Sequence, residues 1–286
     1  MQTTFDIIAI ENPAVDIIHT PDKRILETFG GSSTNVIVHL SRLGLRVGLI
    51  GSIGDDYYGN LVLRDLEEEN VDIQRLRRLH GNTRTWTMKT SPQSYSRLGR
   101  KNGVRSRRLT NDDLAYLKSS ESLYITLTQS LFGEASAVTN EYGSRLFTNL
   151  HGLRQGDTNL PLLSKRDIEI LFSNDEESQI ARQYISELVT RRKTLVVITK
   201  SKDGCEVYQS SHHERYPAFI VNSIDPIGAG DAFSAGFIYG YLKGWELPRI
   251  CAYANGIGAL ATTFYGARSR KIGENEVVDL IGKLAH

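Results

Sequence analysis

Short apolar runs alternate with segments of helical spacing along most of the chain, and this alternation restricts the fold more than any other feature of the sequence. A strand, a helix and a second strand in succession form a unit of parallel sheet covered by helices. Runs that are apolar at every position, such as LVVIT, suit strands buried on both faces. The sequence therefore predicts an α/β protein with strands at residues 5–10, 46–53, 122–127, 145–150, 168–174 and 194–199, and helices at 33–43, 57–69, 132–142 and 176–190.

Two polar stretches, residues 12–29 and about 70–108, interrupt this alternation. They lack helical spacing and, as in NTRTWTMKT, are rich in β-branched residues, which indicates strands. We predict a small β-sheet that is inserted into the α/β domain and covers one edge of it as a lid. No repeat, low-complexity tract or flexible linker divides the chain, so residues 1–286 are expected to form a single domain with this lid.

Composition excludes several classes of protein. A chain of 286 residues buries enough apolar surface to need no disulfide or metal staple. Its net charge of +1 gives no general attraction to nucleic acid or membrane, so neither is expected as a partner. Cys205 and Cys251 lie far apart and the first residues form no basic leader, which favours a reduced, cytoplasmic protein. Residues 250–267 carry no charge, but Asn255 and several glycines favour a buried helix over a membrane span.

The segment DPIGAGDAFSAGF, residues 225–237, carries the strongest chemical signal. Gly228, Ala229 and Gly230 precede Asp231 at the predicted start of a helix of small residues. Backbone N–H groups at a glycine-rich helix start are unobstructed and the helix dipole adds positive potential, so such a start can hold phosphate. A carboxylate beside it can accept a proton from an attacking hydroxyl. The alternative is an Asp that only caps the helix after a glycine turn.

A second segment, FGGSSTN at residues 29–35, leads into another predicted helix. Gly30 and Gly31 leave room for a ligand to approach the backbone. Asn35, one turn into the helix, can both donate and accept hydrogen bonds. On its own, this segment predicts only a loop, a helix and a strand with a polar entrance.

Together these segments resemble the two signature segments of the ribokinase-like (PfkB) family of carbohydrate and nucleoside kinases. Further matches follow in the family's order: NPAVDI, GGSSTN, IGDDYYGN, SNDEE, TLVVITKSKDG, DPIGAGDAF and YANGIGALATTFYGAR. The fold that this resemblance implies is a doubly wound, mostly parallel sheet flanked by helices, with a small β lid, in agreement with the alternation above.

The resemblance implies transfer of the ATP γ-phosphoryl group to a hydroxyl of a small sugar. Asp231 would be the general base, and the amides from Gly228 through Ala229 and Gly230 to Asp231 would form the anion hole. The acceptor would be oriented by four matched residues, Asp16, Gly30, Gly31 and Asn35.

The resemblance also implies a nucleotide side with Mg²⁺. Asn174 and Glu177 match the family's NxxE element, in which the glutamate acts on Mg²⁺ through its waters. The other matched nucleotide residues are Thr199 and Gly204 in the turn, Asn255 near the adenine and Gly266 in the closing loop. Asp225 and the Ile227 carbonyl would bind a monovalent cation such as K⁺. Because lids in this family often pair, a homodimer through the lid is expected.

Three departures from the family pattern bear on the substrate. Ser201 occupies the middle glycine position of the nucleotide turn, T-x-G-x-x-G. Thr148 and Asn149 stand where many members carry an acid. Thr128 and Gln129 replace the acidic sugar contact of ribokinase, which argues against ribose.

Alternatives to a sugar kinase remain open. A nucleoside kinase of the same family is favoured by the NP that precedes Asp16, which adenosine kinases share. A non-catalytic nucleotide or sugar sensor is favoured only by Ser201. The basic stretch from Arg97 to Arg108 could attract an anionic substrate, although charge runs more often solvate a loop or lid edge, and this second role is the one expected here.

Overall fold

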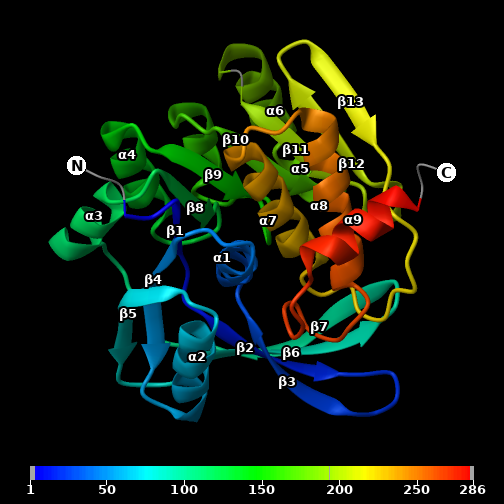
Figure 1. Ribbon diagram of the computed structural model, residues 1–286. Coiled ribbons are helices and arrows are strands. Elements are labelled where there is room, and N and C mark those ends of the chain that lie inside the picture. Colours follow the sequence, from blue (N-terminus) through cyan, green and yellow to red (C-terminus); the bar gives the residue numbers. More distant parts are fainter. Residues whose placement is uncertain (1–3, 193, 284–286) are drawn as a thin grey trace.

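The computed structural model describes residues 4–192 and 194–283, and the strands of this part form two sheets (Figure 1). The larger sheet has nine strands in the order β13-β12-β11-β10-β9-β8-β1-β4-β5. These are β1 (Ile7–Ile10), β4 (Val47–Gly54), β5 (Asp72–Leu79), β8 (Ser122–Thr126), β9 (Arg145–Asn149), β10 (Ile170–Asn174), β11 (Leu195–Thr199), β12 (Cys205–Gln209) and β13 (His212–Tyr216). All pairs from β5 to β11 are parallel, and β12 and β13 add an antiparallel edge. The predicted mostly parallel sheet is confirmed.

The position of β1 decides where a ligand can bind. From β1 the chain adds β4 and β5 on one side, and then returns to add β8 through β13 on the other. Helices therefore diverge to opposite faces at the carboxyl ends of β1 and β8, and open α/β sheets bind ligands at such a switch point.

The helices cover both faces of this sheet. Alternate residues of β1 enter different cores: Ile7 and Ala9 pack with one set of helices, and Ile8 and Ile10 pack with the other. The first core takes residues of α1 (Ser32–Arg42), α2 (Tyr57–Glu68), α7 (Ala229–Leu242) and α8 (Leu247–Ala261). The second takes residues of α3 (Asn111–Lys118), α4 (Phe132–Tyr142) and the segment of α5 (Asp175–Ile180) and α6 (Arg182–Glu187). The apolar residues on both faces of β1 explain why its sequence is a continuous apolar run.

The smaller sheet forms the lid. Its strands are β2 (Ala14–His19), β3 (Ile25–Gly30), β6 (Arg84–Ser91) and β7 (Ser94–Lys101), in the order β3-β2-β6-β7. Figure 1 shows it as a separate layer beneath the large sheet and α7. The predicted lid range of 70–108 is wrong at its start, because β5 pairs in parallel with β4 as the edge strand of the large sheet. The polar face of an edge strand made its sequence resemble that of the lid.

Other helical segments differ from the predictions. The helix expected at 176–190 is broken at Ala181 and ends in the π-helical turn Leu188–Arg192. No glycine or proline marks this break, so the spacing alone could not reveal it. The helix α3 was not predicted. As expected, the uncharged stretch after residue 250 belongs largely to a buried helix, α8, while α9 (Glu274–Gly282) follows it.

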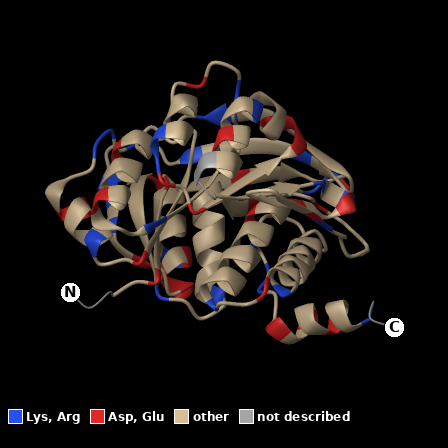
Figure 2. Ribbon diagram, turned by 90° about the horizontal axis from the view of Figure 1, so that it is seen from above, with Lys and Arg blue, Asp and Glu red and all other residues tan. Residues whose placement is uncertain are grey.

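Neither length nor hydropathy suits any helix of the described residues to cross a membrane. Figure 2 shows basic and acidic residues interspersed along the helices and loops.

Candidate active site

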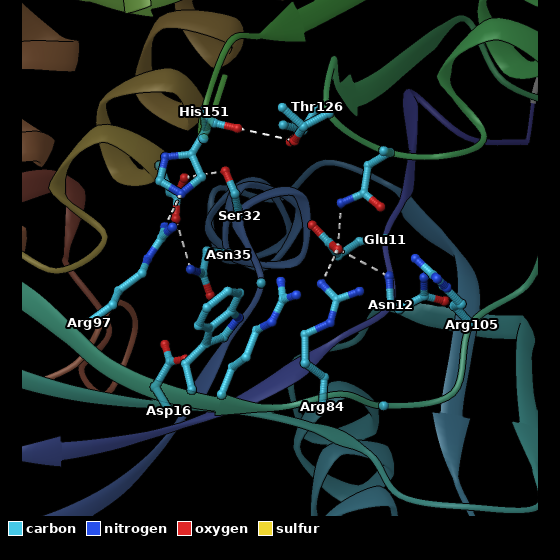
Figure 3. Close-up of a pocket in the computed structure, with 18 of the residues that line it drawn as sticks. Glu11, Asn12, Asp16, Ser32, Asn35, Arg84, Arg97, Arg105, Thr126 and His151 are labelled. Carbon is cyan, nitrogen blue, oxygen red and sulfur yellow. Dashed lines mark hydrogen bonds and ion pairs between the residues drawn. The ribbon is translucent and has the colours of Figure 1, made fainter. Parts of the chain in front are cut away.

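A cavity of about 920 Å³ opens at the switch point of the large sheet, between that sheet and the lid. Residues that follow β1 and β8 line it from the sheet side, among them Asn12 and Gln129. Side chains of β2, β6 and β7 line it from the lid, and Gly228 and Asp231 line it from the start of α7. Figure 3 shows this convergence, with Asp16, Arg84 and Arg97 near the lid strands and Ser32 and Asn35 on the opposite wall.

Asp231 lies in the first turn of α7, and both of its carboxylate oxygens are held by side chains from α1. Ser32 Oγ donates to Oδ1 at 2.6 Å, and Asn35 Nδ2 donates to Oδ2 at 2.8 Å. Burial raises the pKa of Asp231 to about 6, against the lowering effect of the Asn35 and Ser32 donors. The group is therefore fixed in orientation and changes charge near neutral pH, as a proton acceptor should.

The start of α7 requires one glycine for steric reasons and leaves open space at another. Gly228 has φ 80° in the left-handed region, and a Cβ there would lie 2.3 Å from Ala267 Cβ. A Cβ at Gly230 would meet no atom within 4 Å. Ala229 begins the helix between them. The helix start thus has open space beside Gly230, while the Ala229 N–H donates to the Pro226 carbonyl at 3.2 Å.

Asp16 extends from β2 into the same cavity and is buried. Gly30 makes space for it, since a Cβ on Gly30 would lie 2.3 Å from Asp16 Oδ2. Burial and the Asp231 charge raise the pKa of Asp16 to about 7, while Arg268 and Arg97 act in the opposite direction. Within the described residues the Asp16 carboxylate has no hydrogen-bond partner, so it is available to a ligand. Gly31, predicted with Gly30, also lines the cavity and has φ 102°.

Asn35 is oriented by a buried ion pair that the sequence analysis missed. Arg268 Nε donates to Asn35 Oδ1 at 3.2 Å, and Arg268 Nη2 lies 2.7 Å from Asp65 Oδ2. This chain of contacts fixes which end of the Asn35 amide faces Asp231. No spacing in the sequence connects residues 35, 65, 231 and 268, so only the fold could reveal the arrangement.

Ser32 and Glu11 are two further polar residues that the sequence analysis did not assign. Ser32 accepts from Asn149 Nδ2 at 3.3 Å, which links Asp231 to the strand end where many relatives carry an acid. Glu11 is buried after β1 and accepts from Gln129 Nε2 at 2.7 Å, with Arg84 at 3.8 Å. Ser32 belongs to the motif GGSSTN, and its hydroxyl in that motif is the one sequence feature that could have indicated a role in the site.

Of the remaining predicted residues, Ile227 lines this cavity and the others do not. Asn174 and Thr199 are paired in register at the ends of β10 and β11. Asn174 Oδ1 accepts from the Glu177 N–H at 2.8 Å, and Glu177 Oε1 accepts from the Gly152 N–H at 2.8 Å. The second Glu177 oxygen, Oε2, has no hydrogen-bond partner among the described residues. The structure therefore brings these three groups together at neighbouring strand ends, beside the cavity wall that contains Gly152.

The predicted turn residues are shaped by backbone requirements. Gly204 has φ 92°, and a Cβ there would lie 2.0 Å from the Tyr216 carbonyl oxygen. Ser201, in the middle of the turn, adopts φ 52°. Thr199 Oγ1 donates to the Ser173 carbonyl at 3.3 Å. Farther along, buried Asn255 directs Nδ2 at Cys205 Sγ, 3.6 Å away.

The predicted cation ligands, Asp225 and Ile227, are both buried in the loop before α7. Asp225 Oδ1 accepts from the Thr90 hydroxyl and, at 3.0 Å, from the Ile227 N–H. Asp225 Oδ2 accepts from the Gly266 N–H at 2.8 Å. These contacts tie the lid strand β6 to the loops before and after α7 and α8. In residues 4–192 and 194–283 no group of three or more His, Cys, Asp or Glu side chains is arranged to hold a metal.

The basic stretch divides into two parts. All five arginines of the stretch are exposed, but only Arg97, Arg100 and Arg105 line the cavity, whereas Arg107 and Arg108 do not. The expected role of a solvated lid edge therefore accounts for only part of the stretch.

The fold and this site together define an α/β enzyme of the ribokinase-like class, and comparisons with known proteins agree. Residues 4–140 and 155–272 match the model of the pfkB family of carbohydrate kinases. An ATP-dependent ribose-1-phosphate kinase of Halopiger xanaduensis is 31% identical over 251 residues, which are 84% of this chain and 82% of that protein.

Solved structures resemble this fold over nearly its whole length. An adenosine kinase of Sinorhizobium meliloti has a TM-score of 0.83 at 20% identity, with 99% of this chain and 100% of that chain covered. A putative ribokinase II of E. coli, solved with ATP and Mg²⁺, has a TM-score of 0.79 at 18% identity, with 99% and 100% covered. The chain belongs to the pfkB family of carbohydrate kinases, and is thus a phosphotransferase with an alcohol group as acceptor.

Proposed function

We propose that this protein transfers the γ-phosphoryl group of ATP to a hydroxyl of a small sugar. The observation that carries the proposal is the position of Asp231, which is buried at the start of α7 and held in the cavity by Ser32 and Asn35. A carboxylate in this position can remove the hydroxyl proton beside a helix start that attracts phosphate.

Bound ATP supplies the phosphoryl group that is transferred. In its ionised form, Asp231 accepts the proton of the acceptor hydroxyl as that oxygen bonds to phosphorus and the bond from phosphorus to the ADP oxygen breaks. The first amides of α7, from Gly228 to Asp231, stabilise the negative charge on the transferring group. The open space beside Gly230 supports this role, because a ligand can approach the helix start there.

Asp16 orients the acceptor. Its carboxylate faces the cavity without a protein hydrogen bond from any described residue, so sugar hydroxyls can donate to it. Gly30 and Gly31 keep the backbone close to this position. Asn35 acts mainly on Asp231, since its amide is already shared between Asp231 and Arg268.

The residues at the ends of β10 and β11 fit a nucleotide with Mg²⁺. Asn174, which is exposed, and the unpartnered Oε2 of Glu177 offer oxygens to the water shell that Mg²⁺ retains. The turn from Thr199 to Gly204 would border the nucleotide, with Asn255 and Gly266 on its adenine side. The E. coli protein of the same fold, solved with ATP and Mg²⁺, supports these two as the ligands.

Asp225 is a candidate for binding K⁺ together with the Ile227 carbonyl. Its carboxylate is fully buried, and no Lys, Arg or His of the described residues forms an ion pair with it. A buried charge is costly without a counter-ion. Assays with K⁺ replaced by choline should therefore show lower activity, and equal rates would remove this assignment.

The cavity favours a sugar over a nucleoside. A nucleobase needs an apolar or aromatic slot, and the aromatic side chains that line the cavity are Trp86 and Tyr95, both from the lid. The Trp86 ring is already covered by Arg97 at 4.8 Å and Arg100 at 5.8 Å. A base stacked on Trp86 would have to displace these guanidinium groups.

A panel of sugars and nucleosides tests the proposed function. With ADP release coupled to a dehydrogenase, we expect turnover of one or more sugars and none of adenosine. Turnover of nucleosides alone would favour the nucleoside kinase, and ATP binding without turnover of any acceptor would leave a non-catalytic sensor.

We also propose a cytoplasmic homodimer that pairs through the lid. All eight residues of the edge strand β7 are exposed, which leaves its outer side open to a second chain. Cys205 and Cys251 are buried free thiols, as suits a reducing compartment. Light scattering should give twice the chain mass, and a monomer at micromolar concentration would contradict this assembly.

A further inference from the structure

We infer that the sugar held in the cavity carries a negatively charged group, a phosphate or a carboxylate, which binds to an arginine cluster formed by Arg97, Arg100 and Arg105. This inference rests on the proposed function, because it takes the cavity to be the acceptor site. It adds a chemical class of acceptor and a second anchor, separate from Asp16 and Asp231.

The arginine cluster has no acidic ion-pair partner among the described residues. Among the described residues no carboxylate forms an ion pair with Arg97, Arg100 or Arg105, although all three line one cavity. Arg84, in contrast, lies 3.8 Å from Glu11 and is neutralised by it. The three guanidinium groups thus add positive charge to one cavity without an ion-paired carboxylate, and an anionic ligand would supply the partner.

A β-bulge places two of these arginines on the same side of the lid. In a regular strand, residues three apart point to opposite faces. Here Thr87 pairs with Gly99 and the next residue, Met88, pairs with Arg97, so Leu98 is an extra residue in β7. As a result Arg97 and Arg100 both lie against the ring of Trp86.

The third arginine stands on an anchored loop. The Val104 N–H donates to the Asn82 carbonyl at 2.9 Å, and the Ser106 hydroxyl bonds to Ser52. Gly103 lets this loop approach β6 closely, since a Cβ there would lie 2.3 Å from the Arg84 amide nitrogen. The backbone on both sides of Arg105 is therefore anchored. Figure 3 shows Arg84 between Arg97 and Arg105.

The chemistry of the cluster selects the ligand. Guanidinium groups bind phosphate and carboxylate through paired N–H donors, and the binding is strongest where the groups are fixed beforehand. Arg97 also donates to His151 Nε2 at 3.1 Å, a contact that orients the guanidinium group without pairing it with a carboxylate. Burial lowers the pKa of His151, and the Arg97 charge adds to this effect while Glu177 opposes it.

Kinetics with three acceptor classes test the inference: neutral sugars, aldonic acids and sugar phosphates. We expect kcat/KM for one of the charged classes to exceed that of its neutral counterpart by roughly 100-fold, and the class that is preferred identifies the group. Equal values for charged and neutral sugars would overturn the inference while leaving the kinase function intact.

Substitutions locate the anchor. Arg100→Gln and Arg105→Gln should each raise KM for the charged acceptor about tenfold to a hundredfold, with kcat and the KM for ATP nearly unchanged. Arg107→Gln, in the same stretch but outside the cavity, should match the wild type. If the KM for ATP rose instead, the arginines would serve the nucleotide and the inference would be wrong.

A binding measurement separates this inference from the proposed function. Trp86 and Trp245 are the two tryptophans, so Trp245→Phe leaves a single reporter that lies against the cluster. Saturable quenching by a sugar phosphate or an aldonate without any turnover would support the anionic site and contradict the kinase. Turnover without such quenching, and without preference for charged acceptors, would support the kinase function and contradict the anionic site.

Discussion

Two halves of the site are built in different ways. The acceptor half, Asp16, Asn35 and Asp231, depends on contacts between residues far apart in the chain, such as Asn35 with Asp231 and with Arg268. The nucleotide half, Asn174, Glu177 and Thr199, depends more on local contacts, such as the bond from the Glu177 N–H to the Asn174 side chain. We infer that substitutions in the acceptor half affect several groups at once, whereas substitutions in the nucleotide half remain local.

The largest effect is expected for Asp231→Asn. An amide keeps the size of the side chain but cannot take up the proton, so kcat should fall by about 10² to 10⁴, the usual contribution of a general base. Binding of ATP, measured by calorimetry, should persist because the nucleotide half is unchanged. Asp279→Asn, on the exposed face of α9, serves as the control. A rate close to that of the wild type would remove Asp231 as the base.

Glu177→Gln tests the nucleotide half. Because the carboxylate would act through water molecules of Mg²⁺, its loss should weaken metal use by about tenfold to a hundredfold. The deficit should shrink as the Mg²⁺ concentration is raised, while the KM for the acceptor stays constant. Glu176→Gln, exposed in the same turn, should have no effect. A change in acceptor KM would show that the two halves are not independent.

Asn35→Ala should damage only the acceptor half. It removes one donor from the Asp231 carboxylate and one acceptor from Arg268, so we expect kcat to fall about tenfold, as for the loss of a charge-assisted hydrogen bond. In the same turn, the buried Thr34 hydroxyl has no hydrogen-bond partner among the described residues, so Thr34→Val is the matched control. Equal rates for wild type and Asn35→Ala would contradict the orienting role.

The smallest effect is expected for Ser201→Gly. Ser201 has φ 52°, so glycine relieves backbone strain, while its greater freedom in the unfolded chain opposes the gain. The free energy of unfolding should change by less than about 1 kcal/mol, and the KM for ATP by less than twofold. By contrast, Gly204→Ala should destabilise the protein, because its Cβ would meet the Tyr216 carbonyl at 2.0 Å. A large rise in ATP KM for Ser201→Gly would show that the serine side chain contacts the nucleotide.

The sequence predicted the sheet, its main strands and the residues around Asp231, because apolar runs and glycine motifs are local signals. It misplaced β5, whose polar exposed face resembles a lid strand. It could not predict that Arg268 orients Asn35, since that contact spans more than 200 residues. Nor could it predict that Arg97 and Arg100 lie on one side of the lid, because this depends on a single extra residue in β7.

The pH dependence of kcat/KM for the acceptor tests most directly the claim that Asp231 is the base. A base must be ionised, and burial raises the pKa of Asp231 to about 6 and that of Asp16 to about 7, so activity should fall as the pH drops through this range. In Asn35→Ala the acidic limb should move to higher pH, because the lost donor had lowered the pKa of Asp231. Asp231→Asn should have a low kcat/KM, and its pH profile should lack the acidic limb that is due to Asp231. An unshifted limb in Asn35→Ala, or the wild-type profile retained in Asp231→Asn, would contradict the account.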